Sequence, residues 1–175
     1  FDDERFRAAF ECSIIDLPRG MLIQHPHLMS DVNVAVVVTE LTLAAARDSI
    51  RILSWLKTNA PQTRVLVVAN RVHAGMPEIS RKDFEQSIER KVDILIPFDL
   101  KVAAQSAKLG KTLAETAKGS KVGAGCAALL DAVLGAAEES EADNNAPPAK
   151  KGDSLLGKIT DLKSMIPSRK AKTSA

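Results

Sequence analysis

Four short apolar runs rich in β-branched residues divide the first hundred residues of the chain. They lie at residues 12–16, 32–39, 64–70 and 92–97. The middle two runs are almost unbroken in Val and Leu, which is typical of strands that are buried on both faces. The pattern therefore predicts a strand at each of the four runs.

Helical spacing fills the segments between these runs. After the second run, apolar residues recur at steps of three or four: Leu43, Ala46, Ile50, Leu53 and Leu56. A second helix is predicted over residues 80–91, with Ser80 as its N-cap and Asp83 in the place of the Glu of a capping box. The alternation of strand and helix predicts an α/β fold with a mostly parallel sheet and flanking helices.

The second half of the chain reads as helical and then as polar. Helices are predicted over residues 101–109, closed by Gly110, and over residues 121–137. Residues 138–154 are acidic at first and then contain Asn, Pro and Lys, a composition typical of a disordered linker. We therefore divide the chain into a domain at 1–137, a linker at 138–154 and a tail at 155–175.

The tail combines an apolar stripe with basic residues. The stripe consists of Leu155, Leu156, Ile159, Leu162, Met165 and Ile166. Such a segment can lie on an anionic membrane or dock into a groove on a partner protein. The sequence leaves both contacts open.

Composition and charge narrow the function classes. The chain has 175 residues, of which 45% are hydrophobic and 26% charged, as in an ordinary soluble globular protein. Its net charge of +2 divides into +5 from residue 150 onward and −3 before it. Nucleic-acid binding by the domain is therefore not expected. Cys12 and Cys126 form neither a disulfide framework nor a metal site, and the cytoplasm is the expected compartment.

The ends of the predicted strands carry the candidate chemistry, because parallel α/β sheets bind ligands outside the carboxyl ends of their strands. The first run ends at Asp16, and Gly20 follows it closely. An Asp at the end of an apolar strand commonly holds Mg²⁺, often through water. A Gly lets backbone N–H groups approach a phosphate closely. A capped turn after a strand explains the same residues equally well.

Further motifs follow in an order that resembles the MinD/ParA group of deviant-Walker ATPases. Within that group the chain most resembles the CpaE/TadZ pilus-assembly branch. The motifs are Asp16-Leu17-Pro18-Arg19, Arg47-Asp48 on a helix, Asn70-Arg71, and Ile96-Pro97-Phe98-Asp99 followed by Gly110-Lys111. The resemblance covers residues 10–134 and rests on the order and spacing of the motifs together.

The resemblance implies a P-loop NTPase-like fold that uses ATP and Mg²⁺ and dimerises with ATP. It implies polar positioning of a tight-adherence (Flp-type) pilus machine, with the secretion ATPase and the inner-membrane platform as partners. It also assigns roles by position: Asp16 near Mg²⁺ as the catalytic residue, Gly20 near the γ-phosphate, Asn70 at the adenine edge, and Pro97 and Asp99 lining the base pocket. Arg71, next to Asn70, is assigned to cofactor binding as well.

The chain departs from the family pattern in its phosphate loop. Few residues precede Asp16, and none of the glycine-containing segments at 110–112, 119–125 and 152–158 has both the residues and the context of such a loop. We therefore expect the carboxyl half of an ATPase domain, incomplete on its amino-terminal side, with an exposed sheet edge and no ATP hydrolysis by this chain alone.

Two other functions fit parts of the same pattern. A scaffold of this fold could bind partners without any nucleotide. A DNA-partitioning ATPase of the ParA type would need exposed basic residues on the domain, and the net charge of −3 before residue 150 disfavours it.

Overall fold

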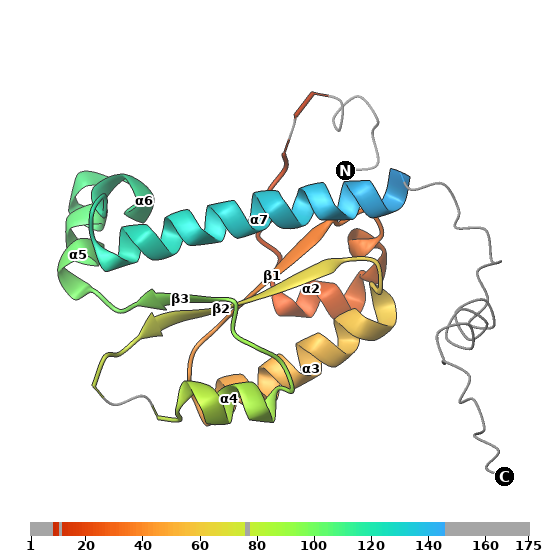
Figure 1. The fold of residues 1–175 in the computed structure, drawn as a ribbon, viewed down its shortest axis with the longest axis horizontal. Coiled ribbons are helices and arrows are strands. Elements are labelled where there is room, and N and C mark those ends of the chain that lie inside the picture. Colours follow the sequence, from red (N-terminus) through yellow and green to blue (C-terminus); the bar gives the residue numbers. More distant parts are fainter. Residues whose placement is uncertain (1–8, 11, 76–77, 146–175) are drawn as a thin grey trace, which may run out of the picture. The chain divides into compact units, whose positions relative to one another are not determined.

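The computed structural model describes residues 9–10, 12–75 and 78–145. Its centre is a parallel sheet of three strands in the order β1-β2-β3: β1 (Val34–Thr39), β2 (Arg64–Val72) and β3 (Ile94–Pro97). Helices α3 (Leu43–Asn59) and α4 (Arg81–Ser87) cover one face, and α7 (Lys121–Asn145) runs along the other (Figure 1). The predicted α/β fold class is confirmed.

The core lies mainly between the sheet and helices α3 and α4. Val67 and Ala69 of β2 are fully buried there and pack with Phe84 of α4. A second cluster joins Val37 of β1 to Leu56 of α3. These aliphatic contacts hold the carboxyl ends of the strands in fixed positions.

Three of the four predicted strands form, and their ends shift by two residues at most. The strand predicted at residues 12–16 does not form: residues 12–18 have no regular secondary structure, and the Ile14 side chain is 92% exposed. This run holds only two β-branched residues among polar ones, and within the described part of the chain no strand pairs with it to satisfy its backbone groups. Asp16 therefore lies in an exposed, irregular segment.

The edge of the sheet at β1 is open, as the sequence predicts. Within the described residues, β1 pairs only with β2. Its side chains alternate, so Val37 and Thr39 are buried while Val36 and Val38 are 38% and 61% exposed. Two valines on an open edge are a surface that favours pairing with another strand.

The helices differ from the prediction in length and number. Helix α4 ends at Ser87, four positions before the predicted end, and Glu89 just beyond it has a positive φ of 53°. Three short helices were not predicted, because their sequences are too short to show a helical spacing of apolar residues: α2 (Arg19–Gln24), η1 (Pro26–Met29) and α6 (Leu113–Thr116). Helix α5 (Leu100–Leu109) ends at Gly110 in the left-handed conformation, as predicted.

Helix α7 continues to Asn145, so residues 138–145 of the predicted linker are helical. This segment begins with Glu138, Glu139 and Glu141, and Glu favours helices. Residues 146–154 and the tail, with its stripe from Leu155 to Ile166, lie outside the described residues.

Two glycines let α7 begin close to the rest of the fold. A Cβ atom on Gly123 would lie 2.2 Å from the carbonyl oxygen of Ala117, and one on Gly125 would lie 3.1 Å from that of Leu95 in β3. Ser120 caps the helix, because its hydroxyl accepts a hydrogen bond from Gly123 N at 3.1 Å. The glycine-rich segment is thus a helix start, as predicted.

Candidate functional site

The three strands end at one edge of the sheet, and polar residues gather there. Glu40 follows β1, Asn70 and Arg71 lie near the end of β2, and Asp99 follows β3. They share an edge because the strands are parallel and in register, with Val34 opposite Arg64 and Val68 opposite Ile94. This is the edge where ligands bind in parallel α/β proteins.

A cavity of about 320 Å³ opens at this edge, beside β1 and α3. Its wall combines strand-end residues, the first turns of α3, the start of α2 and one amide: Val37, Val38, Thr39, Glu40, Ala45, Asp48, Ser49, Ile52, Arg19 and Asn70. The cavity thus brings together Arg19, Asp48 and Asn70 from three motifs that are far apart in the sequence.

Arg19 closes one side of the cavity through an ion pair. Its Nη1 atom lies 2.6 Å from Oδ1 of Asp48, and Nη1 of Arg51 lies 3.7 Å from the same oxygen. Both arginine side chains and the carboxylate are partly exposed. The Asp-x-Pro-Arg-Gly motif and the Arg-Asp motif of α3 are therefore in direct contact.

A buried pair of hydroxyls lies at the base of the cavity. The Oγ atoms of Thr39 and Ser49 are 3.0 Å apart, and both residues are buried. Ser49 is a polar residue on the face of α3 that packs against the sheet, and the sequence analysis did not single it out. The sequence feature that could have identified Ser49 is its hydroxyl on the otherwise apolar face of α3, because a buried hydroxyl needs a hydrogen-bond partner.

The end of β2 is irregular, and this places Asn70 and Arg71. The pairing of β2 with β3 shifts between Ala69 and Val72, and Arg71 adopts a positive φ of 55°. Oδ1 of Asn70 accepts a hydrogen bond from Arg71 N at 2.8 Å, which supports this turn. The Asn70 side chain lines the cavity as a result.

Arg71 connects the ends of all three strands. Its Nη1 lies 3.3 Å from Oε1 of Glu40, and its guanidinium carbon lies 5.9 Å from the centre of the Phe98 ring. The ring of His73 lies 4.5 Å from the same ring on centres. Glu40 and His73 are thus site neighbours that motif analysis does not assign.

The remaining predicted site residues lie around the cavity rather than in its wall. Pro97 ends β3, and Asp99 caps α5, where Oδ1 accepts a hydrogen bond from Val102 N at 3.1 Å. Gly20 lies in α2 beside Arg19, and a Cβ there would meet nothing within 4 Å. Asp16 does not line the cavity. Their assigned roles toward Mg²⁺, phosphate and base stay predictions.

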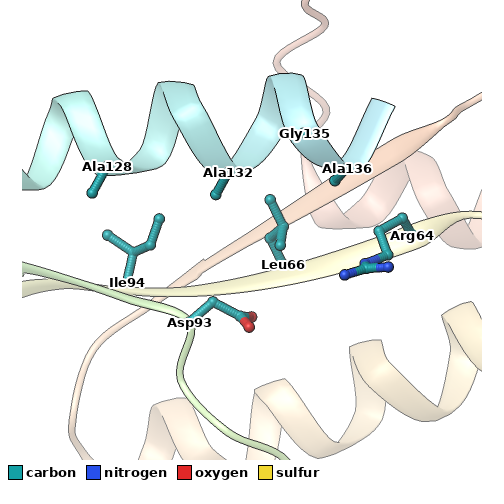
Figure 2. A pocket seen from close by; sticks show the side chains of 8 residues that line it. All are labelled: Arg64, Leu66, Asp93, Ile94, Ala128, Ala132, Gly135 and Ala136. Atoms are coloured by element: carbon teal, nitrogen blue, oxygen red, sulfur yellow. The ribbon is translucent and has the colours of Figure 1, made fainter. Parts of the chain in front are cut away.

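A second cavity, of about 410 Å³, lies between α7 and the sheet (Figure 2). Small side chains of α7, among them Ala128 and Ala132, face Leu66 and Ile94 across it. Asp93 at its border is engaged in the sheet, because Oδ2 accepts a hydrogen bond from Val67 N at 2.7 Å. This cavity lies away from the carboxyl edge, and we read it as loose packing under α7.

In the part of the chain that the structure describes, no helix combines the length and the apolar character that a membrane span requires. No group of three or more His, Cys, Asp or Glu residues there could hold a metal ion.

Comparison with known proteins gives a partial structural likeness. No protein-family model and no curated protein match the chain. A solved structure described as a ParA family ATPase from Chlorobium tepidum TLS resembles it with 23% sequence identity and a TM-score of 0.47. The match covers 53% of this chain and 38% of that chain, so it spans less than half of that protein's length.

Proposed function

We propose that the chain belongs to a nucleotide-dependent ATPase of the MinD/ParA type and that the cavity at the strand ends binds the nucleoside of ATP. One observation carries this proposal: Arg19, Asp48 and Asn70, from three separate motifs, line a single cavity at the ligand-binding edge of a parallel sheet.

Asn70 is suited to read a purine edge. Its Oδ1 is occupied by the hydrogen bond from Arg71 N, so its amide NH₂ remains to donate to a ring nitrogen. Pro97 and Phe98 lie outside the cavity wall and would offer apolar surface to a base that extends toward the end of β3. Asp99 uses Oδ1 as a helix cap, which leaves Oδ2 to accept from an exocyclic amino group.

The phosphate side of the proposed site depends on Arg19, the cation in the cavity wall. Glu40 and Asp48 each pair with an arginine, so neither is a spare metal ligand. Mg²⁺ would come to Asp16 through water, and the backbone at Gly20 would face the γ-phosphate. When bound, Mg²⁺ neutralises charge on the phosphate oxygens.

The cellular role in this proposal is the positioning of a tight-adherence pilus machine at the cell pole. ATP-dependent homodimerisation would switch contact with the secretion ATPase and the inner-membrane platform. The support is the order of the strand-end motifs from Asp16 to Asp99, which resembles the CpaE/TadZ branch. The tail would add a membrane or partner contact at the inner face of the membrane.

A nucleotide-free scaffold is the second candidate, and one observation favours it. The cavity's charges neutralise each other, since Arg19 pairs with Asp48 and Arg71 with Glu40. A wall of paired charges can persist without an anionic ligand. The scaffold would then use the same surface for protein contacts.

Mapping ATP binding to individual residues distinguishes the ATPase from the nucleotide-free scaffold. We would add a non-hydrolysable ATP analogue with Mg²⁺ to the full chain and follow side-chain amide signals by NMR. The proposal expects the Asn70 NH₂ signals to shift saturably, and Asn70→Ala to weaken binding about tenfold, as for the loss of one base contact.

Asn59→Ala is the matched control, because Asn59 ends α3 and its amide donates to Trp55 O at 2.9 Å, outside the cavity. Binding that is unchanged in Asn70→Ala would contradict the proposed base site. No shift at Asn70 at any analogue concentration would favour the scaffold.

A further inference from the structure

The turn between α5 and α6 presents two leucines and two lysines to solvent. We call residues 108–113, Lys-Leu-Gly-Lys-Thr-Leu, the α5–α6 tip. Leu109 is 53% exposed and Leu113 is 40% exposed, and Lys108 and Lys111 are also exposed. Single exposed leucines are common on proteins, but here two of them flank cations within one turn. The tip thus offers apolar and positive surface together.

The tip has a fixed shape. Gly110 has a φ of 60°, and Lys111 N donates a hydrogen bond to Ser106 O at 3.1 Å. The Ser106 hydroxyl in turn donates to Lys111 O. On the other side, Thr112 and Glu115 form a reciprocal capping box. The leucines are therefore held outward by a structured turn, and little conformational entropy is lost when a partner binds them.

The surroundings of the tip are also positive. Three more lysines, Lys101, Lys118 and Lys121, come from α5, the segment after α6 and the start of α7, which lie together at one end of α7 (Figure 1). The nearby carboxylates of Asp99 and Glu115 are occupied as helix caps. Within the described residues, no ion pair involves any lysine of this region. These two carboxylates keep their negative charge as caps, but the five lysines outnumber them, so the region is net positive.

We propose that the α5–α6 tip binds an anionic lipid surface. The lysines would contact headgroup phosphates, while Leu109 and Leu113 would enter the apolar boundary below them. Each lysine near such a surface strengthens binding roughly fivefold. A nucleic acid would attract the lysines but would leave both leucines in water, so the pairing of charge with apolar surface favours lipid. The proposal depends neither on nucleotide binding nor on the tail.

A probe beside the tip tests this directly. Ala114, which is exposed, would be changed to Cys in a full chain that carries Cys12→Ser and Cys126→Ser. A polarity-sensitive fluorophore on this cysteine should shift to the blue with equimolar phosphatidylglycerol and phosphatidylcholine vesicles, and not with phosphatidylcholine alone. The emission of the same fluorophore at Lys57→Cys, an exposed position near the end of α3, should not shift.

Two double variants of the labelled chain separate the contribution of the leucines from that of the lysines. Leu109→Ser with Leu113→Ser should abolish the blue shift, because the probe then stays in water. Lys108→Gln with Lys111→Gln should require at least tenfold more anionic lipid for the same shift.

Several outcomes would overturn the proposal. If the protein binds vesicles while the probe beside the tip stays in water, another part of the chain makes the contact. A shift with duplex DNA and none with vesicles would assign the tip to nucleic acid. An equal shift with neutral and anionic vesicles would remove the role of the lysines.

Discussion

Arg19 and Asp48 form an ion pair of 2.6 Å that joins the segment after Pro18 to the middle of α3. The two residues come from separate motifs, and their contact closes one side of the cavity at the strand ends. The short helix α2, which begins at Arg19, has no buried residues of its own. Leu22 of α2 packs against the cluster that contains Val37 and Leu56, so this apolar contact and the ion pair together hold α2 on the domain.

Arg19→Ala is expected to loosen α2 without unfolding the domain. Partly exposed ion pairs contribute about 1 kcal/mol or less, so the melting temperature should change little. Amide hydrogen exchange across residues 19–24 should become faster. Arg51→Ala is the control, because its contact with Asp48 is longer, at 3.7 Å. Equal exchange rates in the wild type and in Arg19→Ala would contradict the prediction.

The Thr39–Ser49 pair should behave as a coupled unit. Ser49→Ala removes a buried partner of the Thr39 hydroxyl and should lower the free energy of unfolding by about 1–2 kcal/mol. Thr39→Val together with Ser49→Ala should cost less than the sum of the two single changes, since the double change removes both hydroxyls of the pair and each single change leaves one without its partner. Urea unfolding of the four proteins measures this, and strict additivity would show that the contact is not energetically coupled.

Gly123 and Gly135 of α7 should respond in opposite directions to alanine. In Gly123→Ala the new Cβ would meet the Ala117 carbonyl oxygen at 2.2 Å, so the protein should lose about 1–3 kcal/mol. In Gly135→Ala the Cβ meets nothing within 4 Å, and the helix should gain up to about 1 kcal/mol. Chemical denaturation compares the two, and a stable Gly123→Ala would contradict the close approach at the start of α7.

Glu85 makes the free energy of unfolding of the domain depend on pH in the acid range. A hydrogen bond from the Val92 backbone, followed by those from Arg81 and Lys91, lowers the pKa of Glu85 to about 2. Its usual pKa is 4.5, so the unfolded chain takes up this proton first. The stabilisation is therefore present above about pH 4.5 and is lost as the pH falls toward 2.

Glu85→Gln should be less stable than the wild type at neutral pH, and the difference should shrink as the pH falls from 4.5 toward 2. Unfolding free energies measured across this range test the sign. Glu89→Gln, at an exposed position outside this cluster, is the control. A stability difference that does not change with pH would contradict the role of the carboxylate.

Val38 on the open edge should control self-association of the chain. Val38→Lys adds a charge to a side chain that is already 61% exposed, so folding should be little affected while edge pairing is disfavoured. Light scattering at rising protein concentration should show less association than in the wild type. Leu100→Lys at the start of α5 is the control, since it removes a comparably exposed apolar residue that follows β3, the strand at the other edge of the sheet. An equal effect of both changes would show that general hydrophobicity is responsible.

The sequence predicted best where a local pattern decides the structure. The β-branched runs that became β1, β2 and β3 form strands that pair with one another, and Gly110 closes α5 for a local steric reason. The run at residues 12–16 has only two β-branched residues and stays irregular, with no strand paired to it in the described part of the chain. Composition alone does not report whether one is present.

The sequence indicated little of the candidate site. Among the predicted site residues, only Asn70 lies in the cavity wall, and Thr39, Asp48 and Ser49 were not predicted there. The contacts of Arg71 with Glu40 and Phe98 depend on a pairing shift in β2 and on the relative positions of three strands. The contact of Ser49 with Thr39 depends on how α3 rotates against the sheet. Such relations arise only in the assembled fold.

The parallel pairing of the sheet also bears on how the domain can assemble. Val34 pairs with Arg64, and Val68 pairs with Ile94, so a whole helical segment separates each strand from its neighbour. No hairpin can start the process, and each pairing must close a long loop before it gains any contact. Helices α3 and α4 therefore have to dock while the sheet forms, which makes folding a concerted and comparatively slow event.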